Sequence, residues 1–244
     1  MIGISPKGDM KVKPQVYIDE MYDCGLTVDK AAECVEEAFV EHANAGQDFD
    51  PNDVTDFDKM RPLLRARLYN EKTAAEVFES AKLFGFDDLI IVPYLEFKFN
   101  GQDAGIKVNN SLLQKWGTDK ETVLGIAKVN SEKYSDFFLK PMTSVLFDIM
   151  DDDVPEELMD IPVPMYVVSN KRKSFGAFGV IALADLIEEK FPDGYAVIPS
   201  SVHEVIIIPS DSTMYDTVKD MIGDVNTSQL KDEEVLGWKP YYFN

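Results

Sequence analysis

The chain has 244 residues, and its hydrophobic content of 45% is enough to build a full core, which excludes global disorder. Acidic residues outnumber basic residues 44 to 24, which gives a net charge of −20. Because nucleic-acid phosphates and anionic lipids attract Lys and Arg, we expect no direct nucleic-acid binding and no membrane binding. No stretch approaches the roughly 18 apolar residues of a transmembrane helix.

Cys24 and Cys34 are the only cysteines, which is too few for a disulfide framework. Their spacing fits neither a zinc site nor a redox pair. The first residues also lack the apolar core of a signal peptide. We therefore expect a cytoplasmic protein with two inert thiols and without a metal or cofactor.

The amino-terminal part is predicted to be rich in helices. Pro14 and Gly25 bracket a short helix over Pro14–Cys24. Thr27 has the side chain of an N-cap, and the apolar positions up to His42 recur at helical spacing.

Gln47–Asp58 is predicted to be a polar, acidic loop. Its first aspartates match the start of a calcium-binding loop. However, Asp53 stands where that loop needs glycine, and Lys59 stands where it needs glutamate, so we reject a calcium site.

The segment Leu63–Tyr69 fits either a strand or a helix. Thr73 and Glu76 form a capping-box pattern, which predicts a helix that ends near Lys82.

A β-hairpin is predicted over Asp88–Asn110, because Asn100-Gly101 is a favoured pair for a two-residue turn. This turn places Lys98 opposite Asp103, and a pair of opposite charges supports that register. Pro93 predicts that its strand lies at a sheet edge or carries a bulge.

Helices are predicted over Ser111–Trp116, over Asp119–Tyr134 with Thr118 as the cap, and over Pro141–Met150. In the second helix, Val123, Ala127 and Tyr134 are expected to face inward. An acidic, proline-containing stretch then separates a part over residues 1–150 from a part over residues 161–244. The two parts could also form one compact domain.

The carboxy-terminal part is predicted to be a ββαββα unit with a mainly antiparallel sheet, so the fold class is α+β. Ala196–Ile198 and Val205–Ile208 are unbroken apolar runs, which indicate central strands. Ile222 is expected on the inward side of the last helix. The segments that start at Gly105 and Gly179 have corresponding apolar positions, and we hypothesise that a hairpin followed by a helix is used twice.

Several segments resemble an uncharacterised bacterial family, a domain of unknown function from Gram-positive gut anaerobes. They include YIDEMYDCGLTVDKAAECVEEAF, FDDLIIVPYLEFKF, MYVVSNKRKSFGA and, most specifically, PSSVHEVIIIP. The resemblance covers nearly the whole chain and implies a cytoplasmic protein. It carries no established activity, cofactor or catalytic residue.

Ser201 and His203 are the only candidates for catalysis, as the nucleophile and base of a hydrolase. Ser200 and Glu204 fall on the other face of an extended segment, and neighbours along one strand do not align as a triad. The pattern therefore favours a tight turn whose hydroxyls bind backbone groups.

Lys171-Arg172-Lys173 is a run of three basic residues in a strongly acidic chain, and we expect it at a hairpin tip. It could bind an anionic partner. Alternatively, lysines at such a position discourage strand-to-strand aggregation.

We expect a non-catalytic module that binds another protein or a small ligand. Its contact surface would combine Asn170–Gly176 with Ser200–Glu204, if both loops point the same way. The binding residues of this surface are Asn170, Lys171, Arg172, Lys173, Ser200 and Glu204. A hydrolase that uses Ser201 and His203 is one alternative, and an acidic decoy that mimics nucleic acid is a second.

Overall fold

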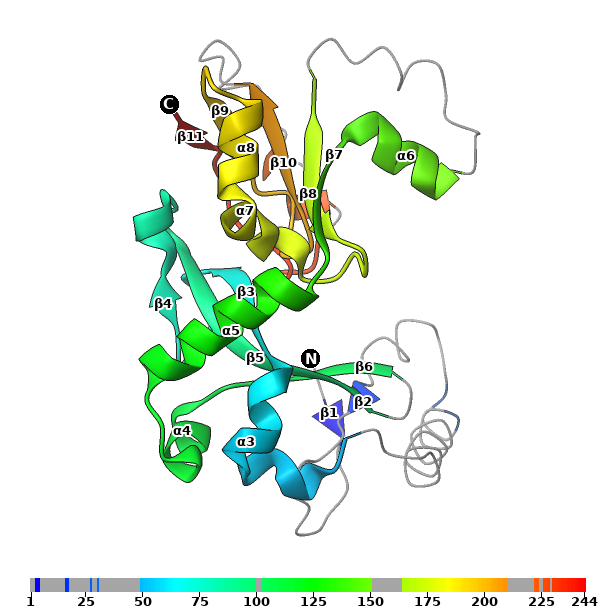
Figure 1. The fold of residues 1–244 in the computed structure, drawn as a ribbon. Coiled ribbons are helices and arrows are strands. Elements are labelled where there is room, and N and C mark those ends of the chain that lie inside the picture. Colours follow the sequence, from blue (N-terminus) through cyan, green and yellow to red (C-terminus); the bar gives the residue numbers. More distant parts are fainter. Residues whose placement is uncertain are drawn as a thin grey trace. The chain divides into compact units, whose positions relative to one another are not determined.

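A computed structural model describes residues 3–4, 16–17, 27, 30, 49–99, 102–150, 164–209, 222–223, 226–228 and 230–244. The α+β class is confirmed, because helices accompany two larger antiparallel sheets (Figure 1). The chain divides into a unit of residues 1–60 and 96–105 and a unit of residues 61–95 and 106–244. None of the helices in these ranges combines the length and apolar content that crossing a membrane requires.

In the first unit, strand β1 (Gly3–Ile4) pairs with strand β2 (Val16–Tyr17). The prediction of a helix over Pro14–Cys24 is wrong at Val16 and Tyr17, because their backbones pair with another strand. Residues 18–24 lie outside the described part. Thr27 accepts a hydrogen bond from the Lys30 backbone at 3.5 Å, as an N-cap does. The remainder of the predicted helix is outside the described residues.

The predicted acidic loop is largely helical. It forms the 3-10 helix η1 (Pro51–Thr55) and helix α3 (Phe57–Met60). Asp50 accepts the Asn52 backbone N–H at 2.8 Å, and so its side chain caps η1. The loop prediction is therefore wrong, because some of these aspartates cap helices.

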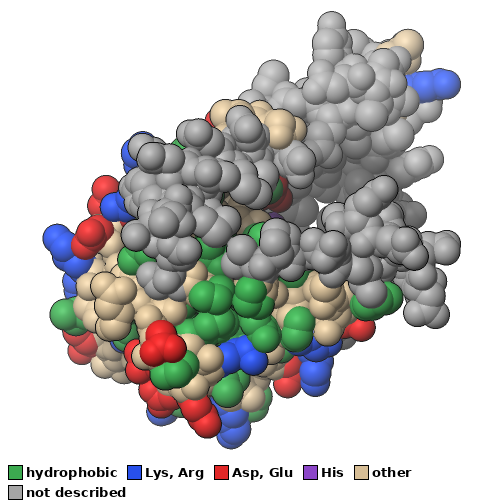
Figure 2. Space-filling model, turned by 90° about the horizontal axis from the view of Figure 1, so that it is seen from above, with side chains coloured by type: hydrophobic (Ala, Val, Ile, Leu, Met, Phe, Trp, Pro, Cys, Tyr) green, Lys and Arg blue, Asp and Glu red, His purple; other side chains and the backbone are tan. Residues whose placement is uncertain are grey.

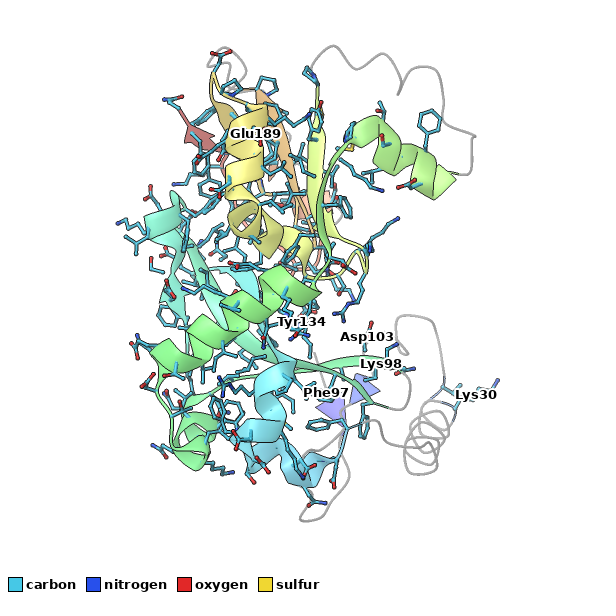
Figure 3. All side chains as sticks on the ribbon, viewed as in Figure 1. Lys30, Phe97, Lys98, Asp103, Tyr134 and Glu189 are labelled. Carbon is cyan, nitrogen blue, oxygen red and sulfur yellow. The ribbon has the colours of Figure 1, made fainter. Side chains whose placement is uncertain are left out.

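The predicted hairpin is formed by strands β5 (Leu89–Phe99) and β6 (Gln102–Lys107). Lys98 Nζ lies 3.8 Å from Asp103 Oδ1, which confirms the predicted charge pair (Figure 3). The predicted turn residues Asn100 and Gly101 lie outside the described residues. Both charged side chains are exposed, so the pair contributes little stability.

Strand β5 is central in a sheet of order β3-β5-β4, and β6 also pairs with it. The segment Leu63–Tyr69, which fits either a strand or a helix by its sequence, forms strand β3 (Leu64–Asn70). The edge prediction for Pro93 is wrong, because β5 has pairing strands on both sides, and no bulge interrupts its register with β3. Pro93 is opposite Ala66, whose N–H donates to the Ser131 hydroxyl rather than to β5. The Pro93 nitrogen therefore faces away from β3, and the missing N–H removes no bond to that strand.

The helix predicted up to Lys82 is absent. This segment contains turns, strand β4 (Glu79–Ser80) and the 3-10 helix η3 (Ala81–Phe84). The carboxylate of Glu76 accepts the backbone N–H of Asn110 at 3.0 Å. The Glu76 carboxylate thus binds the first turn of a helix that is distant in sequence. A capping pattern of neighbouring residues does not reveal such a contact.

Helices α4 (Asn110–Trp116) and α5 (Lys120–Tyr134) agree with the predictions to within a residue at each boundary. The cap of α5 is Asp119 rather than Thr118, because Asp119 accepts the Thr122 N–H at 2.7 Å. Tyr134 is exposed and was wrongly expected to face inward. In contrast, Val123 and Ala127 are buried, as predicted, and α5 lies across β3 in Figure 1.

The second large sheet has the order β11-β9-β10-β8-β7 and is antiparallel throughout. Its strands are β7 (Phe137–Pro141), β8 (Tyr166–Asn170), β9 (Tyr195–Ile198), β10 (Val205–Pro209) and β11 (Tyr241–Phe243). Strands β9 and β10 are central, as the apolar runs predicted. The edge strands β7 and β11 were not predicted. Ile222 is buried against this sheet, as expected.

The residues after β8 form helices and not the predicted second strand. These are η5 (Gly176–Phe178), α7 (Gly179–Ala182) and α8 (Ala184–Lys190). A side-chain carbon at Gly179 would lie 2.9 Å from atoms of Phe137 and Val168, so this helix packs closely on the sheet. The hypothesis of a repeated hairpin and helix is therefore wrong. Helix α6 (Met142–Met150) agrees with its prediction.

Candidate functional site

Two connections of the second sheet meet at the end of strand β8. One is the basic loop, residues 171–175, which joins β8 to η5, and the other is the turn of residues 199–204 between β9 and β10. Gly176 donates its backbone N–H to the carbonyl of His203 at 3.0 Å, and Ala177 donates to Val202 at 3.3 Å. The structure thus brings together the two segments that the sequence singled out. The basic run lies between a strand and a helix and not at the predicted hairpin tip.

Asn170 holds the basic loop from within and is itself buried. Its side-chain amide donates to the carbonyl of Ser174 at 2.8 Å and accepts the N–H of Ser174 at 3.2 Å. The Asn170 carbonyl accepts the N–H of Lys173 at 2.9 Å. Asn170 therefore shapes the loop, and its side chain is occupied by the loop backbone.

Phe175 anchors the end of the basic loop. Its φ angle of 52° lies in the left-handed region, which costs a non-glycine residue of the order of 1 kcal/mol. The guanidinium of Arg67 lies 3.5 Å from the centre of the Phe175 ring and 4.2 Å from that of Tyr94. Arg67 comes from β3 and is buried, so this stack ties the loop to the neighbouring sheet.

The sequence analysis did not identify Arg67 as part of this site. The available signal was the alternation of Arg65 and Arg67 with apolar residues, which places two cations on one face of a strand. That pattern gives no information on which aromatic ring would cover them.

His203 makes contacts through its carbonyl and both ring nitrogens, and two of these groups, the carbonyl and Nδ1, join the turn to the end of the basic loop. Its carbonyl also accepts the hydroxyl of Ser169 at 2.9 Å. Its Nδ1 accepts the backbone N–H of Phe175 at 3.1 Å. Its Nε2 lies 3.5 Å from Oε1 of Glu234. Both ring nitrogens thus face groups of this chain.

Ser201 belongs to a tight turn, as the sequence favoured. Its hydroxyl accepts the backbone N–H of His203 at 3.1 Å, and its own N–H donates to the carbonyl of Glu204 at 3.0 Å. The hydroxyl therefore bonds the backbone of His203, whereas a nucleophile needs a hydrogen bond to the imidazole.

Glu204 and Ser200 have side chains that remain available at this turn. Across the described part of the chain, neither side chain forms a hydrogen bond or an ion pair. Burial raises the pKa of the half-buried Glu204 carboxyl, and the nearby charges of His203 and Lys173 oppose that rise. A carboxylate in this position can accept a donor from a bound partner.

The three basic side chains of the loop are exposed. Lys171 Nζ lies 3.4 Å from Asp136 Oδ2, and both side chains are largely exposed, so solvent screens this pair. Lys173 also has a left-handed backbone, with a φ angle of 52°. The loop therefore presents its cations to solvent from a strongly bent backbone.

The described ranges contain no group of three or more His, Cys, Asp or Glu side chains placed to hold a metal ion. On the face drawn in Figure 2, acidic side chains are dispersed among Lys and Arg and do not form one continuous stripe.

Residues 2–244 match the model of a protein family described as a family of unknown function (DUF5688). No curated protein matches the chain, and neither does any solved structure.

Proposed function

We propose that this chain, which belongs to the DUF5688 family of unknown function, is a non-catalytic module that binds an acidic protein partner. We further propose that it is a bacterial protein that acts in the cytoplasm. The observation that carries the proposal is the basic loop, which displays Lys171, Arg172 and Lys173 while its backbone is held by Asn170 and His203.

The local charge of the basic loop supports an acidic partner. The chain carries −20 overall, so over most of its surface long-range repulsion disfavours an anionic partner. A local run of three exposed cations provides a specific point of attraction. Charges at such a rim mainly determine the association rate and the choice of partner.

The shape of the loop supports binding as well. Ordering a flexible loop on association costs free energy, and a loop already held by its own hydrogen bonds avoids much of that cost. Glu204 and Ser200 lie on the adjacent turn, and their side chains have no partner among the residues that the structure describes, so they could bind the donors of the same partner.

Charge reversal tests the proposal. The variant K171E/R172E/K173E is compared with K72E/K82E/K115E, which changes the net charge equally at three other exposed lysines. Poly-glutamate serves as the acidic probe in calorimetric titrations at low and physiological salt, and affinity capture from native lysate follows. We expect the loop variant to lose at least about tenfold in affinity and the control variant to lose much less. Equal losses in both variants would overturn the proposal.

The hydrolase alternative has a separate readout. Turnover of ester substrates that disappears in both Ser201→Ala and His203→Ala would establish catalysis and contradict a purely binding role. The decoy alternative would be indicated by binding to nucleic-acid-binding proteins that survives reversal of the basic loop.

A further inference from the structure

The contacts of His203 define its neutral form. Because the backbone N–H of Phe175 donates to Nδ1, that nitrogen carries a lone pair and no proton. The single ring proton is therefore on Nε2, which faces Oε1 of Glu234 at 3.5 Å. The other oxygen of Glu234 accepts the backbone N–H of Lys231 at 3.2 Å, which fixes the carboxylate in place.

Protonation of this imidazole adds a hydrogen to Nδ1. Two donors, Nδ1–H and the N–H of Phe175, would then face each other where the structure has a hydrogen bond of 3.1 Å. Phe175 also has an unfavourable positive φ angle, which persists only while its surroundings hold it. Losing the acceptor therefore weakens the attachment of the basic loop at its carboxy-terminal end.

We propose that His203 is a pH-sensitive tether, which fixes the basic loop when it is neutral and releases the loop when it is protonated. This inference rests on the proposed function only where it concerns the partner. Binding of the acidic partner would be strongest with neutral His203.

Charged groups from each neighbouring element act on the imidazole. Glu234 from the segment before β11 and Glu204 from its own turn favour the protonated form. Two cations are also near: Lys173 of the basic loop acts on the carboxyl of Glu204, and Arg67 from β3 lies on the Phe175 ring, whose centre is 5.1 Å from that of the imidazole. The release itself follows from the contact at Nδ1, where protonation replaces an acceptor by a donor.

The tether predicts a change of partner binding with pH that is opposite to the change expected from charge alone. Protonation adds a positive charge beside the basic loop, which alone would strengthen binding to poly-glutamate. If the tether controls the loop, binding instead weakens as the pH falls through the titration of His203. Histidine titrates between about pH 5 and 8, where glutamate probes stay largely ionised.

Nuclear magnetic resonance on the full chain tests the tether without any partner. We expect the ring nitrogen shifts of His203 to show Nε2 protonated at neutral pH. Amide exchange is base-catalysed and slows as the pH falls, so the quantity to follow is the protection factor, the intrinsic exchange rate divided by the observed rate. The protection factor of the Phe175 amide should fall about tenfold as His203 is protonated, which corresponds to the loss of one hydrogen bond. A proton on Nδ1 at neutral pH, or a protection factor of the Phe175 amide that does not change as His203 is protonated, would overturn the inference.

Two variants complete the test. Glu234→Gln removes a carboxylate that favours the protonated ring, so the midpoint of loop release should move to lower pH. His203→Gln does not titrate, so the pH dependence of the Phe175 protection factor should disappear. If reversing the loop charges leaves poly-glutamate binding unchanged while the protection factor of the Phe175 amide still changes as His203 is protonated, the proposed function fails and the tether stands. If binding depends on the loop charges but the protection factor of Phe175 does not change as His203 is protonated, only the tether fails.

Discussion

The hydroxyl of Ser131 accepts the backbone N–H of Ala66 at 2.8 Å, and both residues are buried. Ala66 lies on β3, the edge strand of its sheet, whereas Ser131 lies on α5. The neighbouring Asn130 donates to the carbonyl of Leu64 at 3.2 Å. Helix α5 thus covers the open edge of β3 with side-chain hydrogen bonds, which protects an edge that could otherwise pair with another chain.

Ser131→Ala should therefore destabilise the fold by about 1–3 kcal/mol, because the buried N–H of Ala66 loses its acceptor. Ser111→Ala is a suitable control, since Ser111 is an exposed residue of α4. Urea denaturation of the two variants measures the difference. If both variants match the wild type, the hydroxyl does not contribute to the stability of this edge.

The junction of the two loops depends on a glycine. A side-chain carbon at Gly176 would lie 2.7 Å from the Asn170 nitrogen and 2.7 Å from the His203 carbonyl oxygen. These atoms belong to the backbone of β8 and of the turn, so they have little freedom to move. We expect Gly176→Ala to cost about 2–4 kcal/mol through this overpacking and to separate the loops.

Gly125 provides the matched comparison for that substitution. It lies within α5, and a side-chain carbon there meets nothing within 4 Å. Gly125→Ala should stabilise the protein by about 0.5–1 kcal/mol, because alanine favours a helix. Thermal unfolding of both variants gives opposite shifts in Tm if the close approach at Gly176 is real. A shift of the same sign in both would contradict it.

The stack on Arg67 makes a further prediction. Arg67→Ala should destabilise the protein by about 2–3 kcal/mol, since it removes a buried guanidinium from the rings of Phe175 and Tyr94. Arg67→Lys should recover only part of that loss, because an ammonium group lacks the planar face that stacks on rings. Arg61→Ala at an exposed position is the control, with an expected change below about 0.5 kcal/mol. Full recovery by lysine would show that charge alone matters.

The central strands and the hairpin could be predicted because their signals are local. The run Val205–Ile208 is apolar on both faces, and Lys98 faces Asp103 once the turn is placed. The sequence predicts a strand at Gly179–Ala182 where the structure has a helix, because a short apolar run does not distinguish a buried strand from a buried helix turn. Its packing against the sheet is determined by residues distant in sequence.

The candidate site was predictable only in part for the same reason. Lys171-Arg172-Lys173 and Ser201 to Glu204 are visible as unusual segments in the sequence. That the His203 ring bonds the Phe175 backbone depends on the pairing of β8 with β10, which the sequence does not specify. That pairing also explains why Asn170 and His203 hold the loop backbone while the side chains of Ser200 and Glu204 remain available.

Glu204 gives the last prediction, which concerns pH. Burial raises the pKa of its carboxyl in the folded state above the ordinary value of 4.5. The folded protein then binds this proton more tightly than the unfolded chain, so stability falls as the pH rises from about 4.5 through the folded-state pKa. At neutral pH the ionised carboxylate therefore destabilises the fold.

Glu204→Gln should thus raise the free energy of unfolding at neutral pH, and the gain should disappear as the pH falls below about 4.5, where both states are protonated. Glu189→Gln, on the exposed surface of α8 and labelled in Figure 3, is the control and should show no such gain. Urea titrations over a pH series distinguish the two variants. A glutamine at position 204 that destabilises the protein at neutral pH would mean that the carboxylate is favourably paired, contrary to the contacts seen at this turn.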